Sequence, residues 1–132
     1  MKKIKLITDL QKYLQDLDEI LPEEEEFIDN KSHQYGISML MMNIINVCID
    51  LGTEIISIKQ LGYPNTYRDV FTILEKKKII STKLTKKLKN LVGLRNLLAH
   101  EYGTINFELL YEQAKEIDFV QEYLKEIISY FD

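Results

Sequence analysis

One unbroken pattern of apolar residues between positions 32 and 60 constrains the fold more than any other stretch. Along it, apolar side chains recur in alternating steps of four and three, and a second apolar row runs beside the first. This spacing predicts a long helix with a broad apolar surface, which several neighbouring helices must cover. The first row comprises Ile37, Met41, Ile44, Cys48, Leu51, Ile55 and Ile58, and the second comprises Met42, Ile45, Ile49 and Ile56.

The remaining face of this helix is polar. Asn43, Asn46, Asp50, Thr53 and Ser57 follow one another at helical spacing and form a single line. On a helix that is otherwise buried, such a line either faces water or lines a cleft. The sequence does not choose between the two.

The N-terminal part of the chain predicts a second helix. Apolar residues at spacings of three and four mark an amphipathic helix over residues 3 to 21. Pro22 ends it, and the acidic run 23 to 26 suits the start of the next helix, because carboxylates stabilise a helix N-terminus.

Three further helices follow the long one. After a turn at residues 62 to 65, Thr66 can cap a short helix that ends at the lysines 76 to 78. A fourth helix begins with Ser81 or Thr82 as its cap and runs to about residue 99, where Gly103 is expected to stop it; a last helix covers residues 107 to 131. The sequence therefore predicts an all-α chain, an antiparallel bundle of about five helices.

Composition agrees with one small domain. The chain has 132 residues, enough for a hydrophobic core, and we treat residues 1–132 as a single domain. Its one cysteine, Cys48, excludes an intramolecular disulfide and a Cys-x-x-Cys pair. With only His33 and His100 in addition, a zinc site is not expected, and no cofactor is implied. The N-terminus has no apolar run that fits a signal peptide or membrane span, so we expect a cytoplasmic protein without a membrane partner.

Charge is unevenly distributed along the chain. Residues 68 to 95 carry nine Lys and Arg against two acids, although the net charge is −4. Residues 1 to 30 carry four lysines against nine acids. Such a basic block beside one site can hold a polyanion, or it can be a solvated lysine face. The role of the lysines between 76 and 89 stays open.

The basic block leads into the stretch 95 to 102, which carries the most reactive side chains. At about 100° per residue, Arg95 and Tyr102 fall on the same line of the fourth helix as its leucines. An arginine within an apolar stripe must meet an anion, a partner subunit or a water-filled cleft, since an unpaired buried charge is costly. The leucines of this stripe are Leu84, Leu88, Leu91 and Leu98.

His100 does not share that line. In an unbroken helix it lies about 140° from Arg95. Asn96 stands four residues before His100 and could orient its ring, and Asp50 could reach Arg95 as a supporting carboxylate. Either the helix distorts near Gly103, or a symmetric dimer brings the two side chains together across a two-fold axis.

Arg95, Asn96, His100 and Tyr102, with an apolar run between them, resemble the signature of the HEPN superfamily. More narrowly, the chain resembles the HepT-like ribonuclease toxins of type VII toxin–antitoxin systems, from about residue 5 to residue 128. The tracts 67–71, 74–80 and 48–50 carry further likeness.

The resemblance implies a metal-independent endoribonuclease that acts as a homodimer, with RNA (tRNA or mRNA) in a cleft between protomers. Arg95 and His100 would be catalytic, and Asn96 would position the substrate. These residue types suit the chemistry: imidazole moves protons near neutral pH, and guanidinium presents a planar fork to phosphate oxygens. The resemblance also implies a minimal nucleotidyltransferase antitoxin that silences the toxin by transferring AMP to Tyr102. The alternative is a non-catalytic HEPN-type module that binds a nucleotide or a partner in a regulatory complex.

Overall fold

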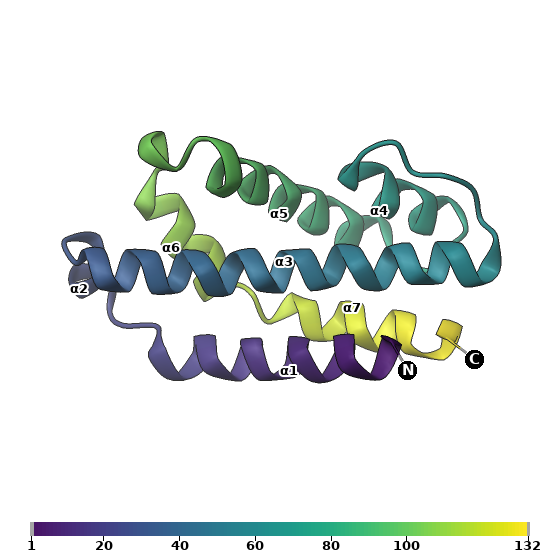
Figure 1. The fold of residues 1–132 in the computed structure, drawn as a ribbon, viewed down its shortest axis with the longest axis horizontal. Helices are drawn as coiled ribbons and strands as arrows, with labels where there is room; N and C mark the ends of the chain where they lie inside the picture. Colours follow the sequence, from purple (N-terminus) through teal and green to yellow (C-terminus); the bar gives the residue numbers. More distant parts are fainter. Residues whose placement is uncertain (1, 132) are drawn as a thin grey trace.

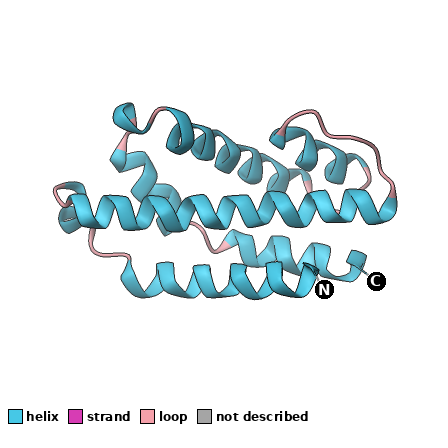
Figure 2. Cartoon of the chain, in the orientation of Figure 1, coloured by secondary structure: helices cyan, strands magenta, loops and turns pink. Residues whose placement is uncertain are grey.

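The computed structural model describes residues 2–131 and consists, over those residues, of helices joined by short loops (Figures 1 and 2). It therefore confirms the all-α prediction. The helices are α1 (Lys2–Ile20), α2 (Glu24–Ile28), α3 (Lys31–Lys59), α4 (Tyr67–Lys76), α5 (Thr82–His100), the 3₁₀-helix η1 (Tyr102–Thr104), α6 (Phe107–Lys115), α7 (Phe119–Ile127) and the 3₁₀-helix η2 (Ile128–Phe131).

Helix α3 is the centre of the bundle. In Figure 1 it lies between α1 on one side and α4 and α5 on the other, and α1 and α5 run antiparallel to it. All residues of its predicted first apolar row are buried except Ile58, which is 46% exposed near the C-terminal end of the helix. The helix is long and apolar enough to cross a membrane by length and composition, but its neighbours bury its apolar face.

Side-chain caps fix where the helices begin. Asn30 accepts a hydrogen bond from a backbone N–H at the start of α3, and Ser81 does the same for α5. Thr66 and Asp69 form a capping box at the start of α4, each side chain bonding the other residue's backbone N–H. The predicted Thr66 cap is thus confirmed, and Ser81 rather than Thr82 caps α5.

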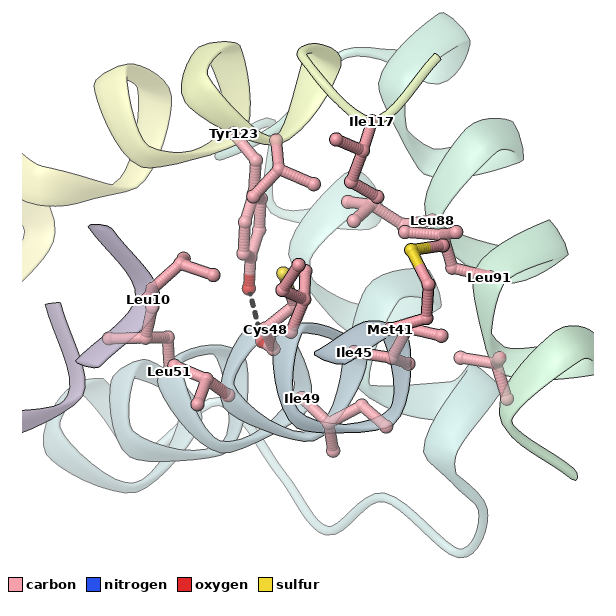
Figure 3. Packing of buried hydrophobic residues seen from close by; sticks show 14 of the residues in the cluster. Leu10, Met41, Ile45, Cys48, Ile49, Leu51, Leu88, Leu91, Ile117 and Tyr123 are labelled. Carbon is pink, nitrogen blue, oxygen red and sulfur yellow. Dashed lines mark hydrogen bonds between the residues drawn. The ribbon is translucent and has the colours of Figure 1, made fainter. Parts of the chain in front are cut away.

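A close helix crossing sets the position of α4 against α3. A Cβ added at Gly52 would lie 2.6 Å from a Val70 methyl group and 3.2 Å from one of Leu74. The buried hydroxyl of Tyr123 in α7 also approaches this point and donates a 2.8 Å hydrogen bond to the carbonyl of Cys48 (Figure 3). Gly52 therefore permits the close packing of α4, through Val70 and Leu74, against α3.

The prediction of one last helix over residues 107 to 131 is wrong. The segment breaks between α6 and α7, where Ile117 donates to Ala114 and Val120 donates to Ile117 in i to i+3 backbone hydrogen bonds. Ile117 is buried in this turn, and the bend lets α6 pack on α2 while α7 buries Tyr123 in the core. This break, together with the short α2, gives seven α-helices over residues 2–131 instead of five.

The predicted end of the α5 helix, at about residue 99, is confirmed to within one residue, but the role predicted for Gly103 is wrong. Gly103 does not stop α5; the helix ends at His100, and Glu101 is its C-cap. The Glu101 N–H still donates to the carbonyl of Leu97, and η1 starts at the next residue. Tyr102 consequently lies on a separate turn. The prediction that it falls on the leucine line of α5 is therefore wrong.

Candidate active site

Arg95 is held by side chains from three helices. Its Nε donates a 3.1 Å hydrogen bond to Oδ1 of Asn46 in α3. Its guanidinium carbon lies 4.6 Å from the centroid of the Tyr67 ring in α4, within the range of a cation–π contact. Nη1 lies 3.5 Å from Oδ1 of the adjacent Asn96. The guanidinium is half-buried and fixed in direction.

The environment of Arg95 explains how an arginine fits into an apolar stripe. The leucines on its line of α5 are buried, as predicted. At Arg95 the stripe reaches the polar line of α3, so the guanidinium meets Asn46 there. Asp50 is exposed and is not among the hydrogen-bond partners of Arg95 in residues 2–131, so it is not the supporting carboxylate that the sequence left open. Of the polar line of α3, Asn46 meets Arg95 and Thr53 lines a groove, whereas Asp50 and Ser57 are exposed to solvent.

His100 is exposed at the last position of α5. Within one protomer, Asn96 contacts Arg95, and the described part of the chain shows no hydrogen bond between Asn96 and His100. The structure therefore brings Arg95 and Asn96 together but leaves His100 facing solvent one turn further along.

Tyr102 lies just beyond His100, within an aromatic cluster. Its ring stacks on that of Tyr35 in α3, with centroids 5.3 Å apart and planes 16° apart. Phe107 meets it edge-on at 5.9 Å and in turn packs against Phe27 at 6.2 Å. The Tyr102 ring is half-buried and Tyr35 is 59% exposed, so the cluster anchors η1 while keeping one side at the surface.

A groove opens beside Arg95 between α4, α5 and the loop before α4; we call it the α4–α5 groove. Its volume is about 820 Å³, and Tyr67 and Asn96 belong to its wall. Arg68 and Lys89 line it as well. Asp69 is its acidic residue, and the carboxylate of Asp69 accepts hydrogen bonds from the backbone N–H groups of residues 65 and 66.

A second groove of about 950 Å³ lies between α5 and the α6–α7 segment. We call it the acidic groove, because four carboxylates and two cations line it. An excess of carboxylates repels a phosphate backbone. Of the two grooves, the α4–α5 groove is the one suited to a polyanion. The charged residues of the acidic groove are Arg68, Lys87, Glu112, Glu116, Asp118 and Glu122.

Other reactive groups lie in the core. Cys48 is buried, and burial raises the pKa of its thiol, which makes it the inert cysteine that the sequence indicated. Burial likewise raises the pKa of the Tyr123 hydroxyl. Within residues 2–131, no three His, Cys, Asp or Glu side chains gather in a way that could hold a metal ion.

Sequence reasoning missed two residues that shape this site. Tyr67 covers the guanidinium of Arg95, and Tyr35 stacks on Tyr102. Tyr67 stands in a tract that carried family resemblance, which was a usable signal. Nothing in the spacing of Tyr35 set it apart from other tyrosines.

Comparisons with known proteins identify the family of the chain. The family described as Ribonuclease HepT-like matches residues 10–127. The mRNA nuclease HepT of Shewanella oneidensis is 26% identical over 129 residues, which are 98% of this chain and 92% of that protein.

Two solved structures share the fold. A tri-AMPylated Shewanella oneidensis HEPN toxin in complex with an MNT antitoxin has a TM-score of 0.76 at 25% identity, covering 96% of this chain and 91% of that one. YutE, a cytosolic protein of unknown function from Bacillus subtilis, has a TM-score of 0.85 at 22% identity, covering 98% and 87%. The match over residues 10–127, on a chain whose fold and motif agree with it, shows that this protein belongs to the HepT-like ribonuclease family.

Proposed function

We propose that this protein is the toxin of a toxin–antitoxin pair and a metal-independent endoribonuclease. In this proposal Arg95 and His100 are the catalytic residues, and Asn96 positions the substrate. One observation carries the proposal: Arg95 is fixed by the neutral partners Asn46 and Tyr67, and no carboxylate of residues 2–131 forms an ion pair with it. Its positive charge is therefore available to a phosphate.

The proposed reaction is attack of a ribose 2′-oxygen on the adjacent phosphorus. The bond to the 5′-oxygen breaks, a 2′,3′-cyclic phosphate forms, and one proton leaves the 2′-hydroxyl while another reaches the 5′-oxygen. The imidazole of His100 is suited to transfer these protons, because one of its ring nitrogens can accept a proton while the other donates one. The Arg95 guanidinium stabilises the charge that develops on the phosphate oxygens.

We further propose that the active unit is a homodimer with RNA in the cleft between protomers. The positions of Arg95 and His100, about 140° apart around α5, support a site that a second copy completes. Tyr35, which stacks on Tyr102, and Met39, one turn further along α3, are 59% and 67% exposed, which suits a contact surface.

Silencing by a nucleotidyltransferase antitoxin is the third part of the proposal. The phenolic oxygen of Tyr102 would attack the α-phosphorus of ATP, releasing pyrophosphate and the phenolic proton. The half-buried Tyr102 ring lies two residues after His100, so the bulky anionic adduct would block RNA at the site. A toxin and antitoxin of this kind would act in the cytoplasm, where their RNA substrates are.

The test is RNA cleavage by the purified protein in excess chelator, with analysis of the product ends. The proposal predicts cleavage without added metal and products that end in 2′,3′-cyclic phosphate. Activity that the chelator abolishes would contradict the metal-independent mechanism. RNA binding without cleavage would support the alternative, a non-catalytic HEPN-type binding module.

A further inference from the structure

We propose that the α4–α5 groove is a nucleotide subsite, which holds the RNA nucleotide next to the scissile phosphate. This inference rests on the proposed ribonuclease function. In it, Tyr67 stacks on the base and Lys89 contacts the backbone phosphate.

The groove is continuous with the proposed catalytic residues. Asn96 lines the groove and also contacts Arg95, and Tyr67 lines it while covering the guanidinium of Arg95. Lys89 and Asn96 are seven residues apart, two turns of α5, and so they lie on one face of the helix. A strand bound at Arg95 would therefore reach the groove within one or two nucleotides.

The walls of the groove have the chemistry that single-stranded nucleic acid requires. Tyr67 remains 45% exposed while it contacts Arg95, and aromatic rings are the surfaces on which unpaired bases stack. The volume of about 820 Å³ lies within the usual range for small-ligand sites.

Lys89 supplies the positive charge for a phosphate in the groove. Neither Arg68 nor Lys89 forms an ion pair with a described carboxylate. Asp69 lies in the same wall, but the backbone N–H groups of residues 65 and 66 bond its carboxylate, as part of the cap of α4. Arg68 lines both grooves, and its Nη2 lies against Gly93 on the side of the acidic groove, so Lys89 is the cation that this groove alone offers to a phosphate.

The acidic groove on the other side of α5 strengthens the assignment. Its four carboxylates, on the α6–α7 segment, would repel a phosphate backbone that left Arg95 in that direction. An RNA strand at Arg95 is thereby directed into the α4–α5 groove.

The first test measures binding of a short single-stranded RNA to the His100→Ala protein, which keeps the substrate intact. Lys89→Gln is compared with Lys86→Gln, since Lys86 is an exposed lysine of the same helix that lines neither groove. Lys89→Gln should weaken binding roughly three- to tenfold and reduce the magnitude of the slope of log K against log salt by about 0.7, the value for one lost phosphate contact. Lys86→Gln should do neither.

The second test concerns the base. An abasic nucleotide is moved along the RNA, one position at a time. For the Tyr67→Phe protein, which keeps the ring, removing the base at one position next to the cleavage point should lower the affinity for the RNA by on the order of tenfold. For the Tyr67→Leu protein, which has no ring on which a base could stack, removing the base at the same position should not lower the affinity for the RNA.

The outcomes separate the two proposals. If the wild-type protein cleaves RNA but Lys89→Gln and Lys86→Gln bind alike, the subsite is wrong and the ribonuclease stands. If binding depends on Lys89 but the wild-type protein does not cleave, the groove is an RNA-binding site and the ribonuclease proposal is wrong. Equal losses with both lysine variants would indicate a diffuse electrostatic effect and overturn the subsite.

Discussion

The guanidinium of Arg95 and the ring of Tyr67 are stacked 4.6 Å apart, although the two residues come from different helices. Together with the hydrogen bond from Asn46, this contact fixes the cation in a half-buried position without neutralising its charge. A fixed and unpaired cation is what a phosphate site requires, because it needs no reorganisation when the substrate arrives.

The ring of Tyr67 should therefore matter to catalysis even though it carries no catalytic group. We expect Tyr67→Leu to lower kcat/KM for RNA cleavage by roughly tenfold or more, since a cation–π contact and the direction of Arg95 are both lost. Tyr67→Phe should keep most of the activity, because it retains the ring. Steady-state cleavage assays check this, and equal activity of the Leu and Phe variants would contradict the positioning role.

The neutrality of the Asn46 partner is the second testable feature. Asn46→Asp keeps the size of the side chain and its acceptor oxygen, but it adds a negative charge 3.1 Å from Arg95 Nε. We expect thermal stability to be retained and cleavage to fall by at least about tenfold, because the guanidinium is then paired with a carboxylate. If the Asp variant cleaves RNA as fast as the wild type, the available charge of Arg95 is not what drives the reaction.

Tyr102 should be needed for silencing and not for cleavage. Tyr102→Phe keeps the ring that stacks on Tyr35 and removes only the hydroxyl. We expect cleavage within about twofold of wild type, and no mass gain of one AMP per modified site when the protein is incubated with ATP and its nucleotidyltransferase partner. A Tyr102→Phe protein that the partner still modifies and silences would show that another residue is the target.

Two glycines of α3 provide a matched pair for the fold. Gly52→Ala should lower the free energy of unfolding by about 1–3 kcal/mol, because the new Cβ would lie 2.6 Å from Val70. Gly36→Ala meets no atom within 4 Å and should raise it by about 0.5–1 kcal/mol, because alanine is the better helix former. Urea unfolding followed by circular dichroism measures both; destabilisation by both, or by neither, would contradict the close crossing at Gly52.

Much of the fold follows from local sequence patterns. The apolar rows of residues 32 to 60 predicted the central helix, and the cap at Thr66 was visible as a residue type in the right place. The bend at Ile117 could not be predicted from the sequence, because no proline or glycine marks it. The bend arises from packing, because α6 contacts α2 while α7 enters the core. The helix propensities of the local residues carry no information about such tertiary contacts.

The candidate site was likewise only partly predictable from the sequence. Counting positions along the fourth helix was enough to identify Arg95 as an arginine in an apolar stripe. The identity of its partners depends on how α3, α4 and α5 pack, so spacing within α5 could not name Tyr67 or choose Asn46 over Asp50. The end of α5 was predicted to within one residue, but the role of Gly103 was not, because a 3₁₀ turn forms there instead of a left-handed glycine cap.

The central claim is that His100 and Arg95 together cleave RNA, and single-turnover cleavage by His100→Gln tests it most directly. Glutamine approximates the size and polarity of histidine but cannot transfer a proton near neutral pH. The account predicts a loss of about a hundredfold or more at unchanged RNA affinity, in excess chelator. A His100→Gln protein that cleaves at the wild-type rate would contradict it.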